Sequence, residues 1–201
     1  VDIACLLSLQ CNAGPRRCGA RRERQPMTAA AHDPSSSERL CGACGMCCDG
    51  VLFHSVELQA GENPRQLSAL GLKLRRKKGV EFFLQPCSAH REESGACSCT
   101  IYEDRPSRCR LFNCRQILAV EAGSVSEADA LEKIRNARAQ VARVNDLISR
   151  LGESNPARSL AHRTANALTL AEGAERTELH DELDATMKGL EGFLAKEFRI
   201  A

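Results

Sequence analysis

Apolar residues recur every three or four positions in the last third of the chain, the spacing of one face of an α-helix. The first such stripe follows Ser126 and Asp129, a pair typical of a helix N-terminus, and stops at Gly152. Its members are Leu131, Ile134, Ala137, Val141, Val144, Ile148 and Leu151. A second helix is expected from Asn155-Pro156 to near Gly173. A third is expected to carry Leu179, Leu183, Met187, Leu190, Leu194 and Phe198. The pattern predicts three helices, antiparallel to one another or wrapped around the preceding segment.

The middle of the chain instead shows short runs of β-branched and aromatic residues between turn residues. Strands are expected over residues 51–58, 80–84 and 97–102. A short helix is expected over residues 65–70, behind Pro64, and a longer one between Pro106 and Gly123. Together with the C-terminal helices, this predicts an α+β fold: a small irregular domain with short strands, followed by an antiparallel segment of about three helices.

The N-terminal 38 residues show neither pattern. Residues 1–26 combine a short apolar run with scattered arginines, and Met27 opens more ordinary sequence. We expect residues 1–26 to be an upstream extension that is not translated in the native protein, with a disordered basic arm as the alternative. The predicted organisation is a disordered extension over residues 1–38, a cysteine-cluster domain over 39–123 and a helical segment over 124–201.

The number and spacing of the cysteines are the most informative feature of the chain. Nine of the twelve cysteines lie between positions 41 and 114, and four of them fall in the octet Cys41-Gly42-Ala43-Cys44-Gly45-Met46-Cys47-Cys48. A C-x-x-C segment can fold as a tight turn that directs two thiolates at one metal ion. Cys47 and Cys48 have diverging side chains, which disfavours a disulfide between them and favours ligation at two sites or at different atoms of one polynuclear centre.

Aromatic residues are too few to form a large core, with six Phe, one Tyr and no Trp. Bound metal is a candidate for the missing stability, since its binding free energy becomes folding free energy. Eight thiols fill two tetrahedral zinc sites, or supply iron–sulfur clusters at four cysteines per cluster. Zinc and iron are not distinguished by these residue types. A disulfide framework is the third alternative, but no export signal is recognised, so we expect a reducing cytoplasm where disulfides rarely persist.

Other residues near the cysteines are further candidates. His54 and His90 are potential ligands, each in place of a thiol. Cys109 and Cys114 are five residues apart, about 140° around a helix, so either the helix begins after Cys109 or the two thiols serve different sites. Four arginines beside the last cysteines can donate N–H groups to sulfur and offset its negative charge, or form a solvated helix face. They are Arg105, Arg108, Arg110 and Arg115.

Charge and hydropathy restrict the partners. The net charge of +2 gives no broad electrostatic case for nucleic acid, and no apolar run approaches the length that spans a membrane. The short basic run over residues 73–78 is a candidate contact for an acidic protein or for nucleic acid, or a solvated loop, and a protein partner is favoured. It gives one alternative function, an interaction module.

Two segments carry a specific family pattern. The octet C-x-x-C-x-x-C-C is followed by Cys87 and by the run from Cys99 to Cys114, C-x-I-Y-E-x-R-P-x-x-C-R-x-F-x-C. Residues 41–114 thereby resemble the CxxCxxCC (YkgJ-type) family, described as zinc- or iron-chelating domains. The resemblance implies eight metal ligands: Cys41, Cys44, Cys47, Cys48, Cys87, Cys99, Cys109 and Cys114. Cys97 lies outside the pattern and is expected to be a spare thiol or a substitute ligand.

The residues and the resemblance together predict a cytoplasmic, bacterial-type metal-binding protein. Its zinc or iron–sulfur cluster is expected to have a structural or redox role, and its eight matched thiols are expected to gather in one region. The family resembles flagellin lysine N-methylases more distantly, so a protein-modifying enzyme is a second alternative. We recognise no methyl-donor motif in the chain, which favours a role without catalysis.

Overall fold

The structure, a computed structural model, describes residues 33–153, 155–170 and 174–200. The predictions made for residues 1–26 lie outside the described residues. The account below concerns the unit that extends from Pro34 to the C-terminus.

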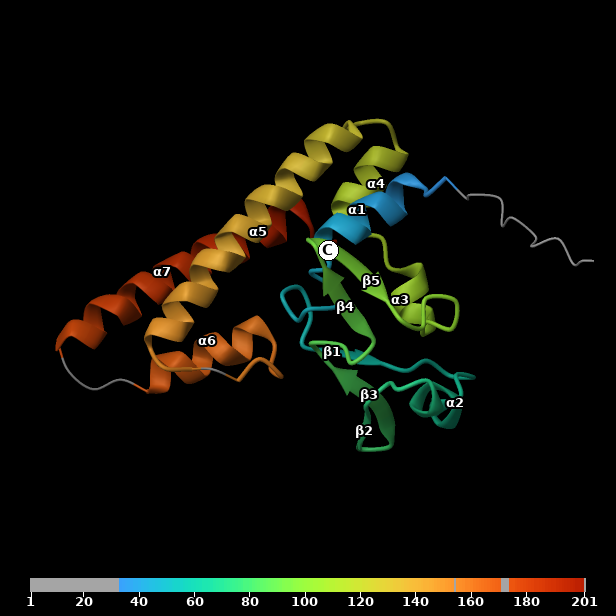
Figure 1. The fold of residues 1–201 in the computed structure, drawn as a ribbon, viewed down its shortest axis with the longest axis horizontal. Helices are drawn as coiled ribbons and strands as arrows, with labels where there is room; N and C mark the ends of the chain where they lie inside the picture. Colours follow the sequence, from blue (N-terminus) through green and yellow to red (C-terminus); the bar gives the residue numbers. More distant parts are fainter. Residues whose placement is uncertain (1–32, 154, 171–173, 201) are drawn as a thin grey trace, which may run out of the picture. The chain divides into compact units, whose positions relative to one another are not determined.

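Helices and short strands alternate in the first part of this unit, and helices alone form the last part (Figure 1). The helices are α1 (Ser36–Cys44), α2 (Pro64–Ala69), α3 (Ser107–Leu111), α4 (Arg115–Glu121), α5 (Glu127–Arg150), α6 (Leu160–Thr169) and α7 (Ala174–Glu197). The strands are β1 (Ser55–Glu57), β2 (Leu74–Lys77), β3 (Val80–Leu84), β4 (His90–Glu93) and β5 (Ala96–Cys99). This order confirms the predicted α+β class with its C-terminal helical segment. None of the helices within the described ranges is apolar enough over sufficient length to cross a membrane.

The strands form two small antiparallel sheets, β1-β3-β2 and β4-β5. Phe83 lies at the centre of the first sheet, opposite Val56 on β1 and Leu74 on β2, and it is buried. One face of this sheet therefore covers a cluster that we call the small core. Its buried members are Leu67, Leu72, Phe83, Ala89 and Ile101. With so few large side chains, this core offers little hydrophobic stabilisation by itself.

The C-terminal helices build a second cluster, the large core. Helices α5 and α7 lie side by side, and α6 contacts both (Figure 1). The stripes predicted on α5 and α7 supply most of the buried side chains, from Ile134 and Val144 to Leu183 and Leu190. Leu40, Met46 and Ile117 from the cysteine-bearing segment join the same cluster. The helices thus pack on that segment as well as on one another, and the domain boundary near residue 123 stays a prediction.

Three predicted elements are wrong in extent. The strand expected over residues 51–58 is limited to Ser55–Glu57, because Val51 and Leu52 turn inward and are buried in the large core. The helix expected from Pro106 to Gly123 is interrupted, since Phe112 adopts an extended conformation between α3 and α4. The second C-terminal helix begins at Leu160 rather than beside Pro156.

Two further elements were missed. The last residues of the disordered extension expected over residues 1–38 belong to α1, which begins at Ser36. Strand β4 (His90–Glu93) was not expected, because its charged residues gave no apolar alternation. The strand expected over residues 97–102 is its partner, β5, and ends at Cys99.

Candidate metal centre

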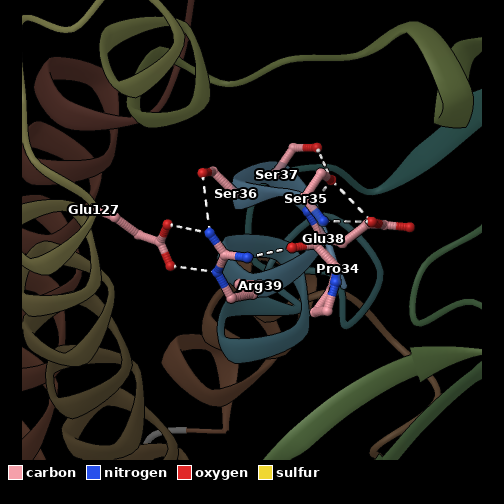
Figure 2. Close-up of polar contacts among 7 residues, drawn as sticks. All are labelled: Pro34, Ser35, Ser36, Ser37, Glu38, Arg39 and Glu127. Atoms are coloured by element: carbon pink, nitrogen blue, oxygen red, sulfur yellow. Dashed lines mark hydrogen bonds and ion pairs between the residues drawn. The ribbon is translucent and has the colours of Figure 1, made fainter. Parts of the chain in front are cut away.

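Helix α1 carries the first two cysteines of the octet, and its N-terminus is well capped. Ser35 accepts a hydrogen bond from the Glu38 N–H at 3.2 Å, and the Glu38 carboxylate accepts from the Ser35 N–H at 2.8 Å. This reciprocal capping box satisfies two otherwise unpaired backbone donors. Figure 2 shows it beside Arg39, which also donates to the carbonyl of Pro34.

Arg39 connects α1 to the start of α5. Its Nε and Nη2 each lie 2.7 Å from a different carboxylate oxygen of Glu127, a two-pronged ion pair (Figure 2). These hydrogen bonds lower the pKa of Glu127 to about 2. The ion pair therefore fixes the helix that carries Cys41 against the first turn of the longest C-terminal helix.

The end of α1 directs four thiols into one region. Cys41 and Cys44 are three residues apart and so share a helix face. Gly45 ends the helix in a left-handed conformation, with φ of 63°, and its N–H donates to the Cys41 carbonyl at 3.0 Å. Cys47 and Cys48 lie in the turn that follows, where the Cys48 N–H donates back to the Gly45 carbonyl at 2.8 Å.

The other matched cysteines come from four different elements. The Cys87 N–H donates to the Cys48 carbonyl at 2.8 Å, which joins the loop after β3 to the octet. Cys99 is the last residue of β5, and Cys109 lies within α3. Cys114 is the N-cap residue of α4, so the break between the two helices separates it from Cys109.

Glu62 holds α3 in place from a distant loop. Its carboxylate accepts hydrogen bonds from the Ser107 N–H and the Gln59 N–H, both at 2.5 Å. Burial raises the pKa of Glu62, but these hydrogen bonds outweigh it and lower the pKa below its ordinary value. Since Ser107 opens α3, the position of Cys109 depends on Glu62, a role that no local pattern in the chain indicates.

Cys41, Cys44, Cys47 and Cys114 form what we call the first thiol group. Burial raises the pKa of Cys41 to about 11, and repulsion from Cys114 adds to the shift. Part of this residue is nevertheless exposed to solvent. Burial raises the pKa of Cys44 to about 12, with repulsion from Cys114 and Cys41. Burial also raises the pKa of Cys47, with repulsion from all three others and from adjacent Cys48.

Cys48, Cys87, Cys99 and Cys109 form the second thiol group. Burial raises the pKa of Cys109 to about 12, with repulsion from Cys87 and Cys99 next. Burial raises the pKa of Cys48 even further, with repulsion from Cys87, Cys109 and Cys99. The pKa of Cys87 is raised by burial and by repulsion from Cys99. The thiols with raised pKa values are thus coupled chiefly to members of their own group.

The two groups lie on different cores. Cys44 and Cys114 belong to the large core, and Cys47 packs against it. Three members of the second thiol group, Cys87, Cys99 and Cys109, pack against the small core. The peptide bond between Cys47 and Cys48 joins the groups.

A hollow of about 790 Å³ adjoins both groups, and six of the eight thiols line it. They are Cys41, Cys44, Cys47, Cys48, Cys109 and Cys114. Arg105 provides positive charge in its wall, and Leu52 and Phe112 provide apolar surface. Charge and apolar cover therefore surround sulfur atoms of both groups.

The thiols are chemically available, but they are not gathered around a point. All nine cysteines between residues 41 and 114 are free. Among the described residues, no three His, Cys, Asp or Glu side chains converge closely enough to hold a metal ion as they stand. The donor set itself fits zinc or iron, since each group offers four sulfurs and both metals take four. Binding would require the side chains of each group to close on the metal.

Cys97 has surroundings different from those of the two groups. Its Sγ lies 3.5 Å from Nη2 of Arg138 on α5, and it occupies the space beside the Cα of Gly45. Burial raises the pKa of Cys97, and Arg138 opposes that shift. Arg138 also pairs with Asp49 at 2.5 Å. This contact of α5 with the octet was not foreseen, because Arg138 resembles any other polar residue on that helix.

The two candidate histidines have other neighbours. The ring of His54 lies edge-on to that of His162, with centroids 5.5 Å apart. His90 is close enough to Asp49 to affect its pKa. Burial raises the pKa of Asp49, and His90 opposes that rise. Nε2 of His90 is buried and has no hydrogen-bond partner. Ligation by either histidine stays a prediction.

The basic run over residues 73–78 forms β2 and the turn into β3, and its basic side chains are exposed. Strand β2 is an edge of its sheet. Charged residues on an edge strand hinder pairing with another chain, so the run has a structural explanation of its own.

Fold and site define a cysteine-cluster protein of the metal-binding class. Residues 40–137 match the CxxCxxCC family model, which carries the description "Putative zinc- or iron-chelating domain". This segment of the chain therefore matches the family whose pattern the spacing of its cysteines resembles. The match includes all eight thiols and the first half of α5. Neither the curated proteins nor the solved structures yielded a match.

Proposed function

We propose that the protein binds two metal ions or clusters, one in each thiol group, and that they cross-link the small core to the large core. The observation that carries the proposal is the placement of the thiols on two cores, three of the first thiol group at the large core and three of the second at the small core. Cys47 and Cys48 fall into different groups, as the divergence of adjacent side chains requires. Zinc or an iron–sulfur unit fits four sulfurs in each case.

The surroundings of the thiols support a structural role. The thiol groups draw on α1, β5, α3 and α4 and on the loop after β3, and the small core beside the second thiol group has only five buried side chains. A metal bound by four thiolates supplies strong bonds where hydrophobic packing is thin. Burial raises the pKa of six of the eight thiols, so these six are neutral near pH 7 without metal, and binding must release protons.

Anaerobic purification followed by elemental analysis and a visible spectrum tests the proposal directly. We expect two zinc ions per chain without visible absorption, or iron and sulfide with the absorption of an iron–sulfur centre. A purified protein that neither contains metal nor takes up Zn²⁺ or Fe²⁺ would overturn the proposal. Reversible reduction of an iron centre would favour a redox role over a structural one.

Paired variants test the division into groups. Cys44→Ser with Cys114→Ser should abolish the first site, and Cys87→Ser with Cys99→Ser the second. Each pair should leave half of the metal content, whereas Cys97→Ser should leave all of it. If either pair removes all of the metal from folded protein, the eight thiols hold one polynuclear centre and the two-site proposal is wrong.

The alternatives from the sequence stay predictions with their own tests. A lysine methylase must bind a methyl donor, so calorimetry with S-adenosylmethionine on metal-loaded protein decides that alternative. An interaction module must lose its partner when Arg75 and Arg76 are replaced by Glu. We expect no methyl-donor binding. Localisation in a bacterial cytoplasm likewise stays a prediction.

A further inference from the structure

Arg105 lines the hollow that adjoins both thiol groups. Cys41 and Cys109, one from each group, also line it. Arg105 is only partly exposed, unlike the neighbouring Arg108 and Arg110, which are exposed. Arg108 also lines the hollow, so it is the partial burial of Arg105 that distinguishes it from the other arginines of α3 and its approach.

Tyr102 fixes the guanidinium of Arg105. The guanidinium carbon lies 3.6 Å from the centroid of the Tyr102 ring, and Nε donates to the Tyr102 carbonyl at 2.8 Å. Stacking on an aromatic face and a directed hydrogen bond restrict the side chain more than either does alone. The Tyr102 hydroxyl donates to Oε1 of Glu38 at 3.1 Å. Glu38 belongs to α1, so Arg105 is connected to the helix of Cys41.

The charge of Arg105 acts on both groups. It opposes the rise in the pKa of Cys41, which burial causes, and likewise the rise in the pKa of Cys109. Arg138 has this effect on Cys44 and Arg91 on Cys87, each within one group. An arginine cannot lose its charge at physiological pH, so Arg105 is a permanent cation in the wall of the hollow.

We propose that Arg105, held by Tyr102, is a positioning residue shared by both metal sites, whose charge offsets that of the thiolates in the first and the second thiol group. The inference rests on the proposed function. Four thiolates around a divalent metal carry net negative charge, and a nearby fixed cation stabilises that bound state. One cation near both sites stabilises both, so its loss weakens both.

Metal titration of variants that retain only one of the two sites tests whether Arg105 acts on both. The Cys44→Ser/Cys114→Ser and Cys87→Ser/Cys99→Ser backgrounds each retain one site. Co²⁺ is added anaerobically against a competing chelator, and thiolate-to-cobalt absorption reports binding. Arg105→Met should weaken Co²⁺ binding roughly tenfold or more in both backgrounds, the range for outer-shell partners of metal ligands. Arg110→Met, an exposed arginine on α3 outside the hollow, should leave both affinities unchanged.

The conservative variants separate charge from packing. Arg105→Lys retains the charge and should recover most of the affinity that Arg105→Met loses. Tyr102→Leu keeps Arg105 but removes its stacking surface, and should weaken both sites by a smaller factor. High salt should reduce the difference between Arg105→Met and the parent, since screening weakens a charge effect but not a packing defect. In the presence of chelator, Arg105→Met and its parent should have the same midpoint of urea unfolding.

Four results would overturn the inference. If Arg105→Met weakens metal binding at one site alone, Arg105 is not shared by the two sites. If Arg105→Met and its parent bind metal equally well, Arg105 has no role in binding. The proposed function stands in both cases. A lower urea midpoint in chelated Arg105→Met, without rescue by Lys, would show a packing role only. Failure of the wild-type chain to bind Co²⁺, Zn²⁺ or iron would remove the proposed function and this inference together.

Discussion

Gly45 is a residue whose identity is imposed by both backbone and packing. Its φ of 63° is left-handed, and a Cβ there would lie 2.4 Å from Sγ of Cys97 and 3.3 Å from Nη2 of Arg138. Both conditions hold at the point where α1 ends and the octet turns. The turn that separates Cys44 from Cys47 therefore depends on a position without a side chain.

Gly45→Ala should destabilise the protein more than a matched glycine replacement. Gly123 has a φ of 68°, and a Cβ added there would have nothing within 4 Å, so Gly123→Ala suffers backbone strain alone, about 1 kcal/mol. Overpacking against Cys97 should add roughly 1–3 kcal/mol in Gly45→Ala. Urea unfolding of the metal-saturated proteins measures both, and adding Cys97→Ala should recover part of the Gly45→Ala loss. Equal costs for the two glycine replacements would contradict the close contact with Cys97.

Glu127 gives a pH-dependent prediction. Hydrogen bonds from Arg39 lower its pKa from 4.5 to about 2, so the folded state favours the carboxylate. The stabilising contribution is present above pH 4.5 and is lost as the pH falls from about 4.5 to about 2. Glu127→Gln should therefore be less stable than wild type at pH 7, and the difference should shrink below pH 4.5. The control is Glu132→Gln, a change at an exposed residue of the same helix, which should have the same stability as wild type in urea unfolding at every pH. If the stability difference between Glu127→Gln and wild type does not change with pH, the ion pair with Arg39 is not its cause.

At the scale of elements, Arg138 connects α5 to the cysteine-bearing segment. Its guanidinium pairs with Asp49 at 2.5 Å and reaches Glu92 on β4 at 3.5 Å. Burial raises the pKa of Asp49 despite this cation, so removal of Arg138 leaves a partly buried carboxylate without compensation. The contact places the octet, β4 and α5 in one network.

A double-mutant cycle of Arg138→Met and Asp49→Asn should give a coupling free energy of about 1–2 kcal/mol. The same cycle on Arg143→Met and Glu182→Gln provides the control. That pair also joins α5 to a neighbouring helix at 3.0 Å, but its side chains are 65% and 42% exposed. Its coupling should be about 0.5 kcal/mol or less because solvent screens it. Similar couplings for the two pairs would mean that Arg138 is no stronger a link than a surface ion pair.

For the whole molecule, the two cores predict an uneven response to metal removal. The small core has five buried side chains, whereas the large core draws on the long stripes of α5 and α7 and on Leu160 and Ala167 of α6. Without metal, amide hydrogen exchange should speed up most in β1 to β5 and α3, and least in α5 and α7. Helices α1 and α4 should respond in between, because Leu40 and Ile117 remain in the large core. Unchanged protection across residues 87–114 after verified metal removal would exclude a structural metal site there.

The sequence by itself determined the features that depend on local pattern. The stripes from Ile134 to Leu151 and from Leu183 to Phe198 are buried as predicted, since apolar residues at helical spacing can only be removed from water on one face. The strand over residues 80–84 and the helix behind Asn63 also follow from local residue choice. The cysteine spacing alone indicated the family whose model matches residues 40–137.

Only the tertiary structure decided which distant groups meet. The division of the thiols depends on the break at Phe112 and on the hydrogen bond from the Cys87 N–H to the Cys48 carbonyl. Neither has a periodic pattern, because one depends on a single backbone angle and the other joins residues far apart in the chain. The same holds for the contact of Arg138 with Asp49, 89 residues apart. Long-range contacts of polar residues are set by how the packed elements approach one another, and a linear pattern does not encode that approach.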